Sequence, residues 1–409
     1  MGLVKIVYFH QHFSTPSGAS GTRSYEMARR LVARGHHVLM VCGSAARGDT
    51  GLSIPFTKGA RRGMVDGLEI LELQLAYSNS DSLIRRSGVF FRFALRSIGV
   101  AMTEPYDLLF ATTTPLTAGL PGIAARWFRG RPFVFEVRDL WPELPRAMGV
   151  IRNPLVLWAL SVLEWGSYRS AQRLIGLSPG IVDGIARRGV APSRIALVPN
   201  GCDLAIFGAA AQPWRPAGVQ ATELMAVFAG AHGIANGLDG VLDAAAQLIV
   251  QGRTDIKIVL VGDGMLKPHL QGRKEREGLA NVIFHGPVAK ARLAGLMAAA
   301  DVGMQILENV PAFYRGTSPN KFFDYLAAGL PVLINYPGWL ADVVKSHECG
   351  YSVPPSDPRA FADALVHAAG HRAALAVMGK RARELARSQF DRAVLADRFV
   401  DWLEGVVSQ

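Results

Sequence analysis

The hydrophobic residues follow two alternating patterns along the chain. Short β-branched runs, such as residues 4–9 (VKIVYF) and 37–42 (HVLMVC), are separated by longer stretches with helical period, such as residues 25–34. The same alternation begins again after residue 219, with strand-like runs at residues 225–230 and 256–262. Strands that alternate with longer helices are typical of a parallel sheet that is covered on both faces. The pattern predicts an α/β fold of two Rossmann-like, doubly wound parallel-sheet domains that face each other across a cleft.

The repeat of this pattern also predicts the domain boundaries. We expect an N-terminal domain over residues 1–199 and a C-terminal domain over residues 200–386. Residues 387–409 have helical period, with an apolar stripe formed by Val394, Leu395, Phe399, Trp402 and Leu403. An apolar stripe on a helix is buried against another element. The C-terminal helix is therefore expected to pack back on the N-terminal domain.

The composition is that of a globular protein. Of the 409 residues, 50% are hydrophobic and 19% are charged, which is enough for two domains with cores of their own. Cys42, Cys202 and Cys349 fit neither a zinc spacing nor a disulfide framework, which favours reduced thiols in the cytoplasm. A strand-like run begins too early for a signal peptide, and no apolar run reaches the roughly 18 residues that span a bilayer.

The formal net charge of +11 indicates an anionic partner, which charge alone leaves open between nucleic acid, a membrane surface and phosphate-rich substrates. Residues 83–98 (LIRRSGVFFRFALRSI) form an amphipathic pattern, with Arg85, Arg92 and Arg96 on one helical face. Ile84, Phe91, Leu95 and Ile98 lie on another face. A basic amphipathic helix with aromatic residues suits an anionic lipid surface, so Arg85, Phe91, Arg92 and Arg96 are candidate membrane contacts. The alternative is an ordinary helix, with its apolar face on the sheet and its arginines in water.

A long loop after the first strand carries the first candidate chemistry. It reads FHQHFSTPSGASGTRS, and its glycines Gly18 and Gly21 can offer backbone N–H groups to a phosphate, with Arg23 as a nearby cation. The spacing is not that of a dinucleotide-binding GxGxxG motif. A flexible turn is the alternative. His10 and His12 could form a metal pair, but no third ligand is evident.

Charged residues also follow the strand PFVFEV. Arg138, Asp139 and Glu143 lie in the turn RDLWPELP, where charges next to a buried strand are costly unless they are paired or used. Arg138 could bind a phosphate and Glu143 an acceptor hydroxyl. The alternative is a network in which Arg138 and Asp139 hold the turn.

The second predicted domain repeats this arrangement. A strand is followed by Gly230, Gly233 and Gly237 around His232 and Asn236, and VGDG, with Gly262, follows the next strand. Such loops at strand ends resemble a phosphate cradle. There is no GxxxxGK[ST] motif and no D-x-D pair, so cations and helix N-termini would have to neutralise a bound diphosphate without a metal. Lys321, Arg23 and Arg138 are the candidate cations.

Residues 317–336 (TSPNKFFDYLAAGLPVLINY) predict a helix between Pro319 and Gly329, followed by a buried strand. Lys321 and Asp324 are three residues apart and share a face of this otherwise apolar helix. The helix N-terminus favours an anion. Lys321 can therefore hold a diphosphate, or it can be the ion-pair partner of Asp324.

Together these segments resemble the family 4 glycosyltransferases of the GT-B fold. The resemblance rests on RSYEMARRLVARGHHVLMV, LSPGI, LVPNGCDLAIF, LVGDG, VIFHGPV and SPNKFFDYLAAGLPVL, in this order over essentially the whole chain. EVRDLWPE and SPNKFFDYLAAG resemble the branch of N-acetyl-L-fucosamine and related sugar transferases of bacterial surface polysaccharides. The resemblance implies a retaining, metal-independent transfer of a sugar from a nucleotide diphosphate donor, here UDP-linked, that lies mainly on the second domain.

The resemblance also implies roles for single residues. The second glutamate of the family's E-x7-E motif falls on Asp324, which would accept hydrogen bonds from the ribose hydroxyls. The first falls on Gly316, so the donor-sugar contact made there is either missing or supplied by a neighbour such as Tyr314 or Arg315. The Arg and Lys that usually grip the diphosphate fall near His232 and Asn236, which makes Lys321 the substitute; His232 can become cationic. The family's frequent histidine after the fourth strand is Arg138 here. The donor-binding set is completed by Thr317, Ser318, Asn320, Gly233 and Gly262.

We therefore expect Arg138, Lys321, Asp139 and Glu143 to serve catalysis in a same-face displacement, in which the leaving phosphate helps to activate the acceptor hydroxyl. The resemblance and the charge together imply a polyprenyl-diphosphate-linked saccharide acceptor and a peripheral position at the inner face of the cell membrane. Three alternatives stay open: a sugar-nucleotide epimerase on the same fold, a catalytically idle scaffold subunit, and a nucleic-acid binder. The last is disfavoured because the basic residues are dispersed.

Overall fold

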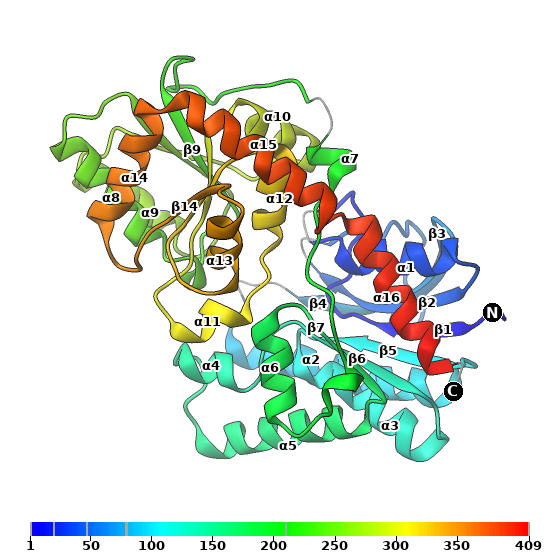
Figure 1. Cartoon of the computed structure of the whole chain (residues 1–409). Helices are drawn as coiled ribbons and strands as arrows, with labels where there is room; N and C mark the ends of the chain where they lie inside the picture. Colours follow the sequence, from blue (N-terminus) through cyan, green and yellow to red (C-terminus); the bar gives the residue numbers. More distant parts are fainter. Residues whose placement is uncertain (1, 19–20, 46–47, 78–80, 209–210, 408–409) are drawn as a thin grey trace. The chain divides into compact units, whose positions relative to one another are not determined.

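The computed structural model describes residues 2–18, 21–45, 48–77, 81–208 and 211–407 (Figure 1). The chain forms two compact units. The first contains residues 1–199, 316–318 and 393–409, and the second contains residues 200–315 and 319–392. The first unit thus includes the end of the chain as well as its beginning.

The first unit is built on an eight-stranded sheet in the order β3-β4-β2-β1-β5-β6-β7-β8. Its strands are β1 (Lys5–Phe9), β2 (His37–Ala45), β3 (Ala60–Val65), β4 (Leu68–Tyr77), β5 (Leu108–Thr112), β6 (Phe133–Val137), β7 (Arg173–Gly176) and β8 (Ile195–Leu197). All neighbours are parallel except β3 and β4, which are antiparallel. The edge strand β3 was not predicted, because its sequence ARRGMV lacks the apolar run of a buried strand.

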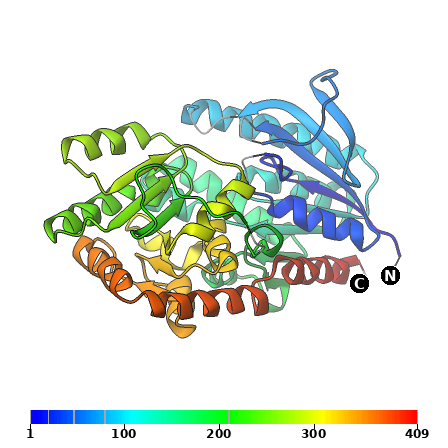
Figure 2. The same ribbon diagram turned by 90° about the horizontal axis from the view of Figure 1, so that it is seen from above.

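Helices cover both faces of this sheet. One layer consists of α1 (Arg23–Ala33) and α16 (Arg392–Val407), which bury Met27, Leu31, Phe399 and Leu403 against strand residues such as Ile6 and Phe110. Figure 2 shows α1 in blue beside α16 in dark red. The C-terminal helix thus packs on the first unit, where Arg30 also pairs with Asp397 at 2.5 Å. Of its predicted apolar stripe, Leu395, Phe399 and Leu403 are buried but Val394 is exposed.

The other layer consists of α2 (Leu83–Thr103), α3 (Gly119–Arg129), α5 (Pro154–Ser170) and α6 (Pro179–Arg187), which share a second core with the sheet. The short helices α4 (Glu143–Ala147), η1 (Leu116–Ala118) and η2 (Pro192–Arg194) complete the unit.

Helix α2 packs against the sheet with a face other than the one that its sequence suggested. It buries Phe93, Ala94 and Ser97, whereas Ile84, Phe91 and Leu95 are exposed together with Arg92. An apolar face does pack against the sheet, but it is not the expected face of Ile84, Phe91 and Leu95. Arg96 is a correction too, because its guanidinium donates to the Gly59 carbonyl oxygen at 2.7 Å and is half-buried. Arg85 remains exposed near Asp81.

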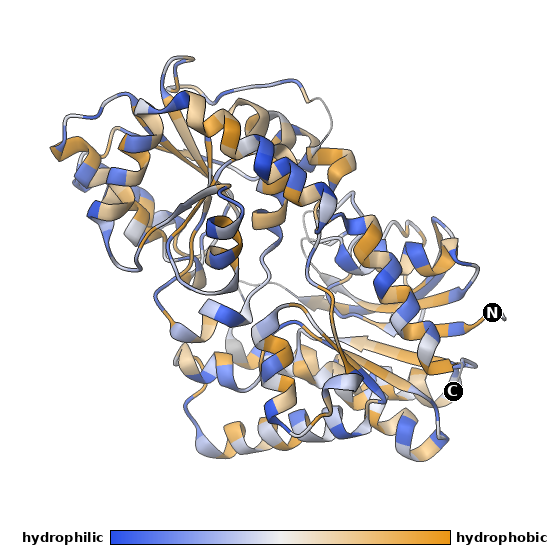
Figure 3. Ribbon diagram, in the orientation of Figure 1, coloured by the Kyte–Doolittle hydropathy of each residue, from blue (hydrophilic) through white to orange (hydrophobic). Residues whose placement is uncertain are grey.

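The second unit contains a six-stranded, fully parallel sheet in the order β11-β10-β9-β12-β13-β14. Its strands are β9 (Leu224–Ala229), β10 (Ile256–Val261), β11 (Val282–His285), β12 (Val302–Gln305), β13 (Val332–Ile334) and β14 (Gly350–Ser352). Figure 3 shows the strands of both sheets predominantly in the orange of hydrophobic residues. Such runs are expected where both faces of a strand are buried.

The helices of the second unit are α7 (Leu204–Phe207), η3 (Ile234–Asn236), α8 (Leu238–Val250), α9 (Lys267–Arg276), α10 (Lys290–Ala299), α11 (Pro311–Gly316), α12 (Asn320–Ala328), α13 (Trp339–Ser346), α14 (Pro358–Gly370) and α15 (Arg372–Ser388). Helix α12 begins after Pro319 and ends at Gly329, whose φ of +72° is the left-handed conformation that glycine adopts without strain. Its predicted start and stop signals therefore match the structure. The prediction of two doubly wound α/β domains is confirmed.

Each sheet has a point where the strand order reverses. In the first sheet it lies between β1 and β5, and in the second between β9 and β12. Open α/β sheets bind ligands beyond the carboxyl ends of their strands at such a point. The loops after these strands are therefore the candidate site in each unit.

Candidate active site

A buried ionic cluster occupies the switch point of the first unit. Glu136, near the end of β6, is fully buried and accepts hydrogen bonds from Arg23 at 2.8 Å and Arg138 at 3.1 Å. The Thr112 hydroxyl donates to the same carboxylate at 2.8 Å. Burial alone would raise the pKa of Glu136, but the charges of Arg23 and Arg138 lower it to about 2. Glu136 therefore stays ionised.

Arg23 is a structural residue, contrary to its prediction as a phosphate ligand. It is 3% exposed, and besides Glu136 it binds the carbonyl oxygens of Val198 and Pro199 at 2.8 and 2.6 Å. Sequence reasoning missed its partner, although the single carboxylate inside the run FVFEV was the available signal. A charge within a buried strand requires a partner of opposite sign.

Arg138 is held in place but remains partly accessible. Its Nη2 donates to the Ser24 hydroxyl at 2.8 Å, and its side chain is 21% exposed. Asp139 accepts from the Thr114 hydroxyl at 3.2 Å, and burial raises its pKa. Glu143 is exposed at the first turn of α4. The three charged residues of the turn thus follow β6. The sequence suggested a network of Arg138 with Asp139, but Arg138 bonds to Glu136 instead.

The two histidines after β1 lie side by side, with ring centroids 6.5 Å apart. His12 packs on Tyr77 and Phe90 at centroid distances of 4.5 and 6.1 Å, and burial together with the charge of Arg138 lowers its pKa to about 4. Within the described ranges no group of three His, Cys, Asp or Glu side chains could hold a metal ion. Of the predicted phosphate loop, Gly18 and Gly21 lie before α1, and residues 19–20 between them lie outside the described residues.

In the second unit, the loops after β9 and β10 are joined by their main chains. The His232 amide donates to the Asp263 carbonyl oxygen at 3.0 Å, and the Gly230 amide donates to Val261 at 3.0 Å. Gly262 has a φ of +141°, and a Cβ there would lie 1.9 Å from the Gly230 oxygen. Only glycine fits at this position. The loop pair is therefore a rigid backbone surface at the switch point.

Lys321 reaches this loop pair from the first turn of α12. Its Nζ donates to the Asn236 Oδ1 at 2.7 Å and lies 4.0 Å from the centroid of the Phe228 ring. The Asn236 amide nitrogen in turn donates to the Ala231 carbonyl oxygen at 2.8 Å, which fixes the side chain. Burial lowers the pKa of Lys321 to about 7. The ammonium thus lies beside Asn236, the residue that stands where the family resemblance expects a lysine.

Of the two roles left open for Lys321, the ion pair with Asp324 is wrong. Lys321 and Asp324 form no ion pair, since neither is joined to the other in the described part of the chain. His232 is fully buried, and burial together with the charge of Lys267 lowers its pKa to about 4, so it is neutral near pH 7.

A second cation at these loops was missed. The Lys267 Nζ donates to the carbonyl oxygens of Gly262 at 2.9 Å and His285 at 3.3 Å. In the sequence, the signal for this cation was Lys267 itself, five residues after Gly262 of VGDG. Two lysine ammonium groups, those of Lys321 and Lys267, therefore bond to residues of these loops.

Asp324 faces a different group of charges. Burial raises its pKa to about 7, with Asp203 as a further raising charge and Arg392 and Lys290 as lowering ones. Arg392 and Asp203 pair with each other at 3.0 Å. Lys321 and Asp324 thus have different charged and polar groups near them, although both lie on α12.

The other predicted donor residues lie along α11 and α12. Arg315 and Gly316 end α11, Thr317 and Ser318 follow it, and Asn320 is the first residue of α12. Gly233 precedes η3 and accepts from the Asn236 amide at 3.0 Å through its carbonyl oxygen. The local sequence thus brings Asn236 and Gly233 to the loop pair with Lys321.

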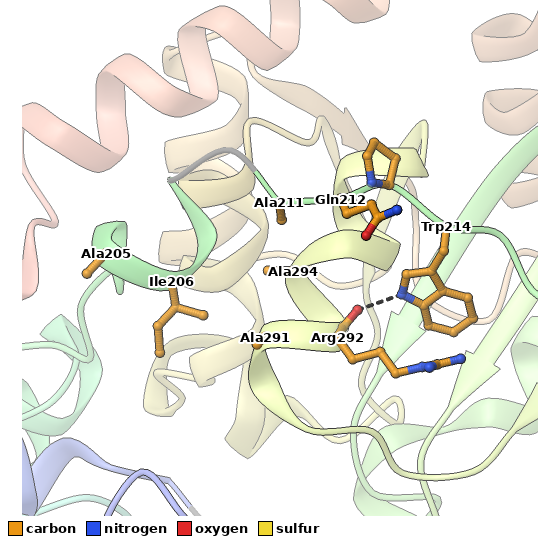
Figure 4. Close-up of a pocket in the computed structure, with 9 residues that line it drawn as sticks. Ala205, Ile206, Ala211, Gln212, Trp214, Ala291, Arg292 and Ala294 are labelled. Atoms are coloured by element: carbon orange, nitrogen blue, oxygen red, sulfur yellow. Dashed lines mark hydrogen bonds between the residues drawn. The ribbon is translucent and has the colours of Figure 1, made fainter.

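A cavity of about 700 Å³ lies elsewhere in the second unit, between α7, residues 211–214 and α10 (Figure 4). Its wall includes Trp214, whose ring nitrogen donates to the Arg292 carbonyl oxygen at 2.7 Å and whose ring lies 4.5 Å from the Arg292 guanidinium. None of the predicted site residues lines it. The cavity is therefore separate from the loop pair.

Comparison with known families identifies the class of protein that this fold and these loops define. Residues 18–201 match the model of the glycosyl transferase 4-like domain, and residues 223–371 match that of the glycosyl transferases group 1. The two matches follow each other and cover most of the chain. The chain belongs to the family 4 glycosyltransferases of the GT-B type.

Individual relatives are more distant. The chain is 29% identical over 279 residues to a D-inositol 3-phosphate glycosyltransferase of Catenulispora acidiphila, which covers 65% of this chain and 63% of the relative. The chain thus spans less than two thirds of the length of the curated relatives it matches.

Two solved structures share the fold over nearly the whole chain. Sucrose-phosphate synthase of Thermosynechococcus elongatus has a TM-score of 0.74 at 20% identity and covers 99% of each chain. Anabaena HepE in complex with UDP-glucose has a TM-score of 0.69 at 17% identity and covers 98% of this chain and 100% of its own. In the described ranges, no helix is long and apolar enough to cross a membrane.

Proposed function

We propose that the protein transfers a sugar from a UDP-linked donor to a hydroxyl of a lipid-linked saccharide, with retention of the anomeric configuration. The observation that carries the proposal is Lys321, a half-buried ammonium at the N-terminal turn of α12 whose hydrogen-bond partner is the neutral side chain of Asn236. A helix N-terminus and an ammonium without a carboxylate partner together suit a diphosphate. The complex of HepE with UDP-glucose supports a nucleotide-sugar donor for this fold.

In the proposed reaction the acceptor oxygen bonds to the anomeric carbon on the face from which the diphosphate leaves. The bond between that carbon and the phosphate oxygen breaks, and the hydroxyl proton passes to the leaving phosphate. Negative charge grows on the diphosphate during this step, so Lys321 and the N-terminal end of α12 would stabilise the transition state more than the ground state. No metal is required in this scheme.

The acceptor-side roles fall to the turn after β6. Arg138 would orient an acceptor phosphate or hydroxyl through the part of its side chain that stays accessible, with Asp139 and Glu143 as further polar contacts. Asp324 would bind the ribose hydroxyls, as its place in the family motif implies. The sequence EVRDLWPE favours an N-acetylated amino sugar as the group transferred in surface polysaccharide synthesis.

A lipid-linked acceptor implies work at a membrane surface, and the net charge of +11 favours the anionic inner face of a cell membrane. The protein would then be peripheral.

The first test is a thermal-shift series with UDP, GDP, UDP-glucose and UDP-N-acetylglucosamine, because a ligand that binds only the folded state raises the unfolding temperature. We expect a uridine nucleotide to give the largest shift, unchanged in EDTA. The product with a polyprenyl-diphosphate-linked saccharide is then analysed by NMR for its anomeric configuration. An inverted product or a strict metal requirement contradicts the mechanism. Epimerised sugar nucleotide formed without an acceptor identifies the epimerase instead, and the absence of any nucleotide shift identifies an idle scaffold.

A further inference from the structure

Helix α5 exposes a continuous apolar stripe. Leu155, Trp158, Val162 and Trp165 recur at helical spacing on its outer side, and Trp158 and Trp165 are 67% and 61% exposed. The segment from Pro154 to Leu163 contains no charged residue. A surface helix of a globular protein normally has its polar residues on this side. The stripe therefore requires an explanation other than packing within the fold.

The stripe continues across the neighbouring helices. The Trp127 ring nitrogen of α3 donates to the Ser170 hydroxyl at the end of α5 at 2.9 Å, and α3 lies beside both α5 and α2 in the same layer. We define the outer apolar face by the exposed residues Ile84, Phe91, Leu95, Trp127, Phe128, Leu155, Val156, Trp158, Val162 and Trp165. Every tryptophan that is exposed in the described part of the chain belongs to it. Exposed apolar patches of this extent mark interaction surfaces.

The accessible charges of these helices are all positive. Helices α2, α3 and α5 carry the seven arginines Arg85, Arg86, Arg92, Arg96, Arg126, Arg129 and Arg169. Their one carboxylate, Glu164, is 3% exposed and pairs with Arg188 of α6 at 2.9 Å. The opposite layer is different, because Asp397, Asp401 and Glu404 of α16 pair with the basic residues of α1 and with His36.

We propose that the outer apolar face docks on an anionic lipid bilayer, with the tryptophans in the interface and the arginines on lipid phosphates. The inference rests on the proposed function only in that a lipid-linked acceptor gives the docking its purpose. Tryptophan prefers the boundary between headgroups and acyl chains, and long basic side chains reach the phosphates from an apolar face.

Charge decides between a bilayer and a second copy of the chain. A two-fold dimer through this face would set the same surface against itself and bring the arginines of both copies together. Anionic lipid instead neutralises Arg92 and Arg169, which are both exposed. A bilayer is therefore the occupant that satisfies the apolar and the charged residues together.

Vesicle flotation tests the proposal with the full chain. Wild type is mixed with two kinds of vesicle, one of phosphatidylcholine alone and one that also contains about 30% phosphatidylglycerol, a composition chosen for the test. The fraction of the protein that floats with each kind is measured. We expect wild type to float with the anionic vesicles. The partition coefficient of the double variant Trp158→Ser/Trp165→Ser should be at least tenfold lower. The double variant Arg92→Glu/Arg169→Glu should lose the part of the binding that depends on phosphatidylglycerol. The matched controls are Val394→Ser and Arg398→Glu, which make the same kinds of change at exposed positions of α16 in the opposite layer.

A second readout locates the face itself. Lipids brominated on the acyl chain should quench the tryptophan fluorescence of wild type and of the controls, and quenching should fall in Trp158→Ser/Trp165→Ser. The thermal shift produced by UDP should be the same in all variants, so failure of docking is distinct from failure of the proposed function. Flotation that the tryptophan variant retains, or a wild type that never floats, overturns the proposal. So does a dimer that this variant converts to a monomer in light scattering, since the face would then be a contact between copies.

Discussion

The two switch points use their cations in opposite ways. At the first, Arg23 and Arg138 converge on the buried carboxylate of Glu136 and are largely satisfied within the fold. At the second, the Lys321 ammonium donates to the amide oxygen of Asn236 and lies over the ring of Phe228, and no carboxylate pairs with it among the described residues. A cation that already has a carboxylate partner serves structure, whereas a desolvated cation without one is stabilised by an incoming anion. Among the described residues, this difference makes Lys321 a better candidate for binding an anion than Arg23 or Arg138.

The largest effect is expected from breaking the first cluster. Glu136→Gln leaves two arginines without their negative partner in a buried place, which should cost about 3–5 kcal/mol of unfolding free energy. Urea denaturation measures this loss. Glu143→Gln, at an exposed carboxylate nearby, is the control and should stay within about 0.5 kcal/mol of wild type. If both variants unfold with the same free energy, the cluster around Glu136 does not stabilise the first unit.

The same cluster predicts a pH dependence. The pKa of Glu136 is lowered in the folded state to about 2 from an ordinary value of 4.5. Its contribution to stability is therefore complete above pH 4.5 and is lost as the pH falls through 2. The difference in unfolding free energy between wild type and Glu136→Gln should shrink across this window in acid titrations. A constant difference would mean that the carboxylate is not ionised in the folded state.

Lys321→Ala tests the second switch point. Loss of a charge-assisted hydrogen bond to the diphosphate is worth about 1.5–3 kcal/mol, so the affinity for a UDP-sugar should fall roughly 10- to 150-fold. Calorimetry gives the dissociation constant, and the unfolding temperature reports the fold. Lys345→Ala, at an exposed lysine of α13, should bind as wild type does. If the variant is less stable but binds the UDP-sugar as tightly as wild type, Lys321 has a structural role, as Arg23 does.

Proton binding to Lys321 should also be visible in the affinity. Burial lowers its pKa to about 7 from 10.5, so the fraction with an ammonium falls above pH 7, and an anion that prefers the ammonium raises this pKa when bound. The dissociation constant of UDP-glucose, whose diphosphate does not titrate in this range, should rise between pH 6.5 and 9 by up to tenfold per unit of pH. Lys321→Met should give a flat profile. A pH-independent wild type would rule out Lys321 as the anion ligand.

The smallest effect is expected at Asp324. Burial raises its pKa to about 7 from 3.8, so the folded state binds the extra proton between these values and stability falls as the pH rises through them. Asp324→Asn should therefore raise the unfolding temperature at pH 8, with the gain vanishing toward pH 4. If Asp324 binds the ribose, the affinity for UDP should also fall by roughly 2- to 10-fold, the worth of one hydrogen bond. A variant that is stabilised but binds UDP normally would separate Asp324 from the donor site.

Much of the fold was predictable because its signals are local. The helix at residues 320–328 has proline before it and glycine after it, and the buried strands are continuous apolar runs. The polar edge strand β3 was missed, because its own sequence has no apolar run and it forms a strand through its antiparallel pairing with β4. The Lys321 site was predicted only in part. Asn236 was expected near the diphosphate, but its bond to a lysine 85 positions away depends on how β9 and α12 pack.

By itself, the sequence determined the α/β class, the two successive sheets, the ends of α12 and the family, because periodicity, caps and ordered motifs are properties of neighbouring residues. Only the tertiary structure decided which charges are satisfied. In the folded chain Arg23 pairs with Glu136, whereas Lys321 has no carboxylate partner among the described residues. His232 is buried in its neutral form, and Trp158 and Trp165 are exposed. The reason is physical: pairing and burial depend on distances between residues far apart in the chain, and the energy of a charge depends on both.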